Sequence, residues 1–82
     1  MVNIKYEPQG FCVAAYDGDR QIGVCQYEIC DNKWSIYHTY TDPAYGGQGI
    51  ARKMVERIAG EADVSGIELT ATCWYARKVL GL

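Results

Sequence analysis

The sequence contains no long hydrophobic run and only one histidine. No apolar stretch approaches the roughly 18 residues of a membrane-spanning helix, and the first ten residues, MVNIKYEPQG, lack the apolar core of a signal peptide. The single histidine, His38, has no cysteine at metal-ligand spacing, and none of the four cysteines shows Cys-x-x-Cys spacing. We therefore expect a cytoplasmic protein with reduced thiols, no metal ion and no membrane partner.

An excess of charge of either sign is also missing. Eight Lys and Arg residues stand against ten Asp and Glu residues, a net charge of −2, so nucleic acid is not an expected partner. Hydrophobic residues make up 49% of the 82 residues, which is typical of an ordinary globular domain. We expect one small domain over residues 1–82, with a correspondingly thin core.

Three segments in the first half of the chain are rich in strand-forming residues. They are FCVAAY, IGVCQYEI and WSIYHTYT, separated by the turn compositions DGDRQ and CDNK, and they predict a three-stranded antiparallel meander. Alternation along the third segment places these side chains on one face: Trp34, Ile36, His38 and Tyr40. Asp42-Pro43 ends the strand, because proline removes a backbone donor.

A helix is predicted next, because apolar residues recur at spacings of one, three and four: Ile50, Ala51, Met54, Val55, Ile58, Ala59 and Ala62. The segment IELTATC then predicts a strand reached by a parallel crossover, and WYARKVLGL predicts a short terminal helix. The expected fold class is α+β, with an antiparallel meander, a crossover helix, a parallel final strand and a short C-terminal helix.

Three glycines, Gly46, Gly47 and Gly49, lie between the third strand and the crossover helix. The first N–H groups of a helix lack partners and the helix dipole is positive there, so glycines at this point let a phosphate approach the backbone. A Walker loop is excluded because Lys and Ser/Thr do not follow Gly49, and the dinucleotide pattern fails because Arg52 occupies its last glycine position. A tight turn without any ligand is the alternative.

The glycine loop and its helix, GGQGIARKMVERIA, resemble the coenzyme A pyrophosphate loop of the GNAT N-acetyltransferases, whose pattern is Gln/Arg-x-x-Gly-x-Gly/Ala. Gly49 and Ala51 match the last two specified positions, whereas Gly46 stands where Gln or Arg is expected. The longer stretch YHTYTDPAYGGQGIARKMV, followed by TATCWYA, is similar to the minimal single-domain group of this family. That group carries His-Thr before the loop and Cys-x-Tyr after the helix.

The resemblance implies a GNAT-like fold whose strands at Thr39 and Cys73 run parallel and splay apart around acetyl-coenzyme A. Pantetheine then hydrogen-bonds to strand backbone near Thr39 and Tyr40, and an N–H near Tyr40 also holds the thioester oxyanion. The loop presents N–H groups to the pyrophosphate. The implied cofactor-binding residues are Thr39, Tyr40, Thr41, Gly46, Gly47, Gln48, Gly49, Ile50, Ala51 and Arg52.

Three side chains are candidates for the chemistry of acetyl transfer to an amine. Cys73, which matches the cysteine of the small group, either accepts the acetyl group or lies beside the thioester. Tyr75 is the candidate proton donor to the coenzyme A thiolate, and His38 is the candidate base. Each has a structural alternative: a buried strand cysteine, a packing tyrosine and a hydrogen-bonded histidine.

The resemblance also bears on the acceptor, an amine on a protein, a peptide or a small molecule. Larger GNAT enzymes build the acceptor site from further helices and strands, so here the groove is expected to be open or completed by a partner or second copy. A non-catalytic acyl-coenzyme A-binding module and a small structural or adaptor domain are the alternative functions. A β-carbon at Gly49 is expected to displace the pyrophosphate at little cost to the apo fold, provided that its φ is negative.

Overall fold

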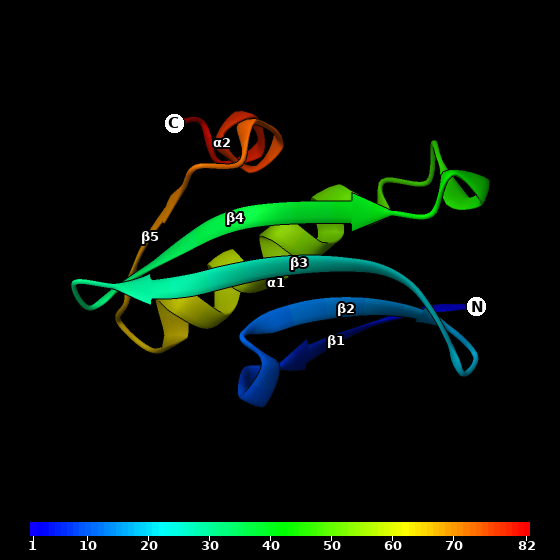
Figure 1. Cartoon of the computed structure of the whole chain (residues 1–82), viewed down its shortest axis with the longest axis horizontal. Coiled ribbons are helices and arrows are strands. Elements are labelled where there is room, and N and C mark those ends of the chain that lie inside the picture. The colour runs from blue at the N-terminus through cyan, green and yellow to red at the C-terminus, as the bar shows by residue number, and fades with distance from the viewer.

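Five strands form one sheet, in the order in which they occur in the chain, in the computed structural model, which describes residues 1–82 (Figure 1). The strands are β1 (Val2–Glu7), β2 (Cys12–Asp17), β3 (Arg20–Cys30), β4 (Lys33–Thr41) and β5 (Glu68–Ala71). The helices are α1 (Ile50–Val64) and α2 (Trp74–Leu80), with short 3-10 turns at Pro8–Gly10 and Pro43–Tyr45. The first four strands are antiparallel and β5 runs parallel to β4, which confirms the predicted α+β class.

Strand β1 was missed by the sequence analysis. It pairs antiparallel with β2 from Val2 to Glu7 and becomes one edge of the sheet. Its apolar residues Val2, Ile4 and Tyr6 are half-buried and pack against the core, while the polar residues between them point away. This period-two alternation is a strand signal that the sequence does carry.

Helix α1 covers one face of the sheet, as its position behind the strands in Figure 1 shows. The predicted apolar stripe is confirmed, because the buried residues of the helix are Ile50, Met54, Val55, Ile58 and Ala62. They pack on fully buried residues of the central strands, including Val13, Cys25 and Ile36. This packing fixes the N-terminus of α1 beside the end of β4, where the glycine loop lies.

A bulge between β3 and β4 changes which side chains of β4 face the helix. The pairing leaves Tyr37 opposite no residue of β3, and after such an extra residue the alternation resumes on the other face. Thr39 therefore shares the α1 side of the sheet with Ile36, whereas His38 and Tyr40 are exposed on the opposite side. The prediction that His38 and Tyr40 share a face with Ile36 was wrong for this reason.

Strands β4 and β5 are in register only over Lys33–Ile36 and then separate. The last bonds between them run from the N–H groups of Thr72 and Cys73 to the Ile36 carbonyl, at 2.9 and 3.1 Å. Figure 1 shows β5 leaving β4 and leading to α2, while β4 continues in another direction toward the glycine loop. The second half of β4 thus has one unpaired edge.

Candidate functional site

The unpaired edge of β4 presents the backbone of Thr39 and Thr41. The Asp42 N–H donates to the Ile22 carbonyl at 2.7 Å, and in an antiparallel pair every second residue bonds across in this way. Tyr40 is therefore turned toward β3, and its carbonyl lies 3.0 Å from where a β-carbon on Gly23 would be. The register therefore turns the N–H groups of Thr39 and Thr41, on either side of Tyr40, toward the gap.

A pocket of about 170 Å³ lies where the gap meets the glycine loop. Seven of the predicted site residues line it: Thr41, Gly46, Gly47, Gly49, Ile50, Ala51 and Tyr75. Tyr45 lines it as well and was not named by the sequence analysis. Gln48 and Arg52 are exposed and do not line the pocket. Arg52 forms an ion pair with Glu56, one turn along α1, at 3.3 Å.

Two of the loop glycines have a backbone conformation that other residues rarely adopt. Gly47 has a φ of 79° and Gly49 a φ of 72°, whereas Gly46 is extended with a φ of −62°. A β-carbon on Gly47 or Gly49 would meet no atom of the chain within 4 Å. Gly49 does not have the negative φ on which the prediction of an inexpensive β-carbon depended, so a side chain there strains the apo fold.

The N-terminus of α1 is left without internal hydrogen-bond partners. Gly49 is the N-cap and contributes no capping side chain, and the first turn has no acidic residue. The first bond of the helix is from the Lys53 N–H to the Gly49 carbonyl, at 3.0 Å. The N–H groups of residues 47 to 52 make no hydrogen bond within the chain, so the loop offers a row of donors at the positive end of a helix dipole.

A buried polar atom without a partner lies in the same pocket. The hydroxyl oxygen of Thr41 is inaccessible to solvent and makes no hydrogen bond in the chain. Buried hydroxyls almost always have a partner, because an unsatisfied one destabilises the fold by about 1–3 kcal/mol. Thr41 and the N–H groups of the loop thus leave unpaired polar groups at this pocket.

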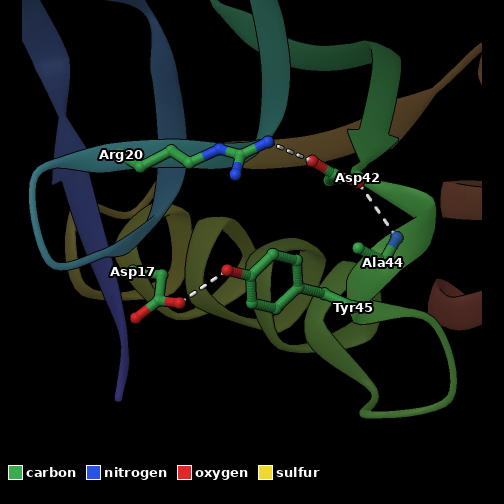
Figure 2. A network of polar contacts seen from close by, with 5 residues as sticks. All are labelled: Asp17, Arg20, Asp42, Ala44 and Tyr45. Atoms are coloured by element: carbon green, nitrogen blue, oxygen red, sulfur yellow. Dashed lines mark hydrogen bonds and ion pairs between the residues drawn. The ribbon is translucent and has the colours of Figure 1, made fainter.

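Figure 2 shows the polar contacts that hold the turn before the loop against the rest of the sheet. The Tyr45 hydroxyl donates to Asp17 of β2 at 2.5 Å, and Arg20 of β3 pairs with Asp42 at 3.2 Å. Asp42 also accepts a bond from the Ala44 N–H at 2.9 Å, which caps the 3-10 turn. The hydrogen bond from the Tyr45 hydroxyl lowers the pKa of Asp17, because it favours the charged carboxylate.

Cys73 lies at the N-terminus of α2, where β5 has already left β4. Its thiol donates to the Thr39 hydroxyl at 3.7 Å, and Tyr75, two residues further, lines the pocket. Burial raises the pKa of Cys73, but the nearby Ala76 N–H and the Thr39 hydroxyl favour the thiolate by more, so the pKa is below its ordinary value. The structure thus brings Cys73 and Tyr75 to the gap and places His38 on the other side of the sheet.

The structure shows no membrane-spanning helix, metal site or disulfide. Neither helix has the length and hydropathy needed to cross a bilayer. No three His, Cys, Asp or Glu side chains gather in a way that could hold a metal ion. All four cysteines are free thiols. Cys12 and Cys25 are buried, Cys73 is half-buried and Cys30 is exposed.

A sheet that splays at a glycine-rich helix N-terminus is the architecture of one acyltransferase family. The model of the GCN5-related N-acetyltransferase family matches residues 10–81. The chain therefore belongs to this family, as the loop and the Cys-x-Tyr element indicated. No curated protein matches the chain in sequence.

Solved structures show the same fold at low sequence identity. A GCN5-like protein from Staphylococcus aureus is 23% identical with a TM-score of 0.74, over 96% of this chain and 78% of that one. A protein of unknown function from meticillin-resistant Staphylococcus aureus is 17% identical with a TM-score of 0.70, over 99% and 86%. PaiA N-acetyltransferase from Thermoplasma acidophilum, in complex with coenzyme A, is 21% identical with a TM-score of 0.63. That match covers 68% of this chain but only 35% of the larger enzyme.

Proposed function

We propose that this chain binds acetyl-coenzyme A in the gap between β4 and β5 and transfers the acetyl group to an amine. The observation that carries the proposal is the row of unpaired N–H groups from Gly47 to Arg52 beside the unsatisfied Thr41 hydroxyl. Donors in this arrangement suit a pyrophosphate. The backbone edge at Thr39 and Thr41 suits the amide groups of pantetheine, which bind as a partial strand.

The side chains at the gap suit a transfer through cysteine. The Cys73 thiolate attacks the thioester carbonyl, the carbon–sulfur bond to coenzyme A breaks, and the departing thiolate takes a proton from the Tyr75 hydroxyl or water. The acceptor amine then attacks the acetyl-cysteine carbonyl and the carbon–sulfur bond to Cys73 breaks. The proton that the amine loses returns to the Tyr75 phenolate or to water, and the Cys73 thiolate is restored. His38 is exposed on the opposite face of the sheet. It could act as the base only for an acceptor that contacts both this face and the gap.

Calorimetry with coenzyme A, NAD and ATP tests the binding step. We expect heat and a raised melting temperature with coenzyme A, because a ligand that binds only the folded state stabilises it by RT ln(1 + [L]/Kd). NAD and ATP share a pyrophosphate but lack pantetheine, so they should bind more weakly. Neither heat nor thermal shift with coenzyme A would leave a structural or adaptor role as the better account.

Replacing Gly46 by Arg should tighten coenzyme A binding, because it restores a cation where the family pattern has Gln or Arg. The φ of −62° accepts any residue, and the new β-carbon would lie 3.2 Å from the Pro43 carbonyl, which must shift by a few tenths of an ångström. We expect affinity to rise by about three- to tenfold, since a charge-assisted bond to phosphate is gained.

Gly46→Met is the matched control, because it adds a side chain of similar length without the charge. Titration calorimetry at low and high salt separates the two variants, since only the arginine effect is screened by salt. If Gly46→Arg binds no better than Gly46→Met, the pyrophosphate does not lie at this loop.

A further inference from the structure

Three side chains from three elements form a polar chain inside the otherwise apolar core. The Thr39 hydroxyl of β4 lies 3.6 Å from the Cys25 sulfur of β3 and 3.7 Å from the Cys73 sulfur at the start of α2. Cys25 is completely buried, and Cys73 is half-buried at the rim of the gap. Thr39 therefore connects a sealed thiol with one that is accessible from the gap.

The two thiols have different environments. Burial raises the pKa of Cys25 to about 11, so this group remains a protonated thiol throughout the neutral range. Cys73 lies at the N-terminus of α2, where the nearby N–H groups of Ala76 and Tyr75 and the Thr39 hydroxyl favour its thiolate and lower its pKa. Cys25 therefore keeps an S–H that it can donate to Thr39, and Cys73 is an acceptor whenever it loses its proton.

The direction of the hydrogen bonds follows from this difference. A hydroxyl has one proton to donate and lone pairs to accept with. When Cys25 donates its S–H to the Thr39 oxygen, the single Thr39 proton is free to point at the Cys73 sulfur. The order Cys25 to Thr39 to Cys73 satisfies each group when Cys73 is a thiolate.

No charged side chain forms an ion pair with the Cys73 sulfur that could stabilise its thiolate in place of Thr39. The buried residues that α1 contributes to the core are all apolar, and Cys25 is the titratable group facing the cluster from β3. Arg77, one turn along α2, donates to the Ala71 carbonyl at 3.0 Å instead. Thr39 is the side-chain hydroxyl within reach of the Cys73 sulfur.

We propose that Thr39, oriented by the buried Cys25 thiol, is a positioning residue that donates its hydroxyl proton to the Cys73 thiolate and sets the reactivity of this cysteine. The hydrogen-bond chain from Cys25 through Thr39 to Cys73 rests on the proposed function only where it is used in acetyl transfer. Its effect on Cys73 is a property of the folded chain without coenzyme A, so the two proposals fail independently.

The test is the rate at which iodoacetamide alkylates Cys73 over a range of pH in the apo protein, followed by mass spectrometry of peptides. A Cys30→Ser background removes the exposed competing thiol. Thr39→Val should slow alkylation at neutral pH by about tenfold and move the pH profile to higher pH, since a bond to a charged group is lost. Thr39→Ser, which keeps the hydroxyl, should restore both.

Two further variants separate the effect of the hydrogen bonds on Cys73 from an effect of altered packing. Thr72→Val, the same substitution at the exposed neighbour of Cys73, should leave the profile unchanged. Cys25→Ala should shift the profile in the same direction as Thr39→Val but less, because the hydroxyl remains and only its orientation is lost. An unchanged profile in Thr39→Val would overturn the proposal, and an unchanged profile in Cys25→Ala would remove Cys25 from it. If Thr39→Val does not fold, Thr39→Ala removes the same hydroxyl, and an unchanged profile in Thr39→Ala would equally overturn the proposal.

Discussion

Replacement of Cys73 by alanine is expected to abolish the acetyl adduct that acetyl-coenzyme A leaves on the chain, while affinity for coenzyme A stays within about twofold of the wild type. The adduct disappears because Cys73 is the one thiol that faces the gap at the start of α2 with a lowered pKa. Affinity is preserved because the proposed cofactor contacts come from the backbone of β4 and the loop. Intact-mass spectrometry reports the adduct, and calorimetry reports the affinity.

Cys30→Ser is the control for this experiment, because Cys30 is the exposed cysteine at the hairpin between β3 and β4. It should leave both the adduct and the affinity unchanged. An adduct that persists in Cys73→Ala, or that maps to Cys30, would show that the nucleophile is assigned incorrectly. Turnover that survives in Cys73→Ala would favour direct attack of the amine on the thioester.

Gly49→Ala should weaken coenzyme A binding by about tenfold or more, because its methyl group would occupy the space of the pyrophosphate. It should also destabilise the apo fold by about 1–2 kcal/mol, since its φ of 72° is strained for any residue with a β-carbon. A loss of stability alone would not distinguish a ligand site from a tight turn. The two effects have to be separated by a second glycine.

Gly66 provides this comparison at the other end of α1. Its φ is 68°, and a β-carbon there would also meet no atom within 4 Å, so Gly66→Ala has a similar conformational cost. Chemical unfolding should show similar losses of stability in both variants, and calorimetry should show a loss of affinity only in Gly49→Ala. Equal affinities in the two variants would mean that Gly49 is needed for the turn and not for a ligand.

The fold was largely predictable because its signals are local. The strand-forming composition of the central strands, the apolar stripe of α1 and the proline after β4 each act within a few residues, and the structure follows them. Strand β1 carried the same kind of signal in Val2, Ile4 and Tyr6. The glycine loop could be singled out for the same reason, since the binding role predicted for it depends on consecutive backbone groups.

The remaining features depend on contacts between distant segments. The bulge that turns His38 away from the helix arises from the pairing of β3 with β4, and no residue type marks it in the sequence. The role of Tyr45 depends on Asp17, which is 28 residues away along the chain. Likewise, a threonine between two cysteine sulfurs becomes visible only when β3, β4 and α2 are placed together.

The most direct test of the account is a two-dimensional ¹H–¹⁵N NMR titration of the chain with coenzyme A. The account predicts that the largest amide shifts occur at Gly47 to Arg52 and at Thr39 and Thr41, whose N–H groups face the pyrophosphate loop and the gap. The Tyr40 amide, which is turned toward β3, should shift less than its two neighbours. Uniformly small shifts at these amides, or a cluster of large shifts on β1 and β2, would contradict a coenzyme A site between β4 and β5.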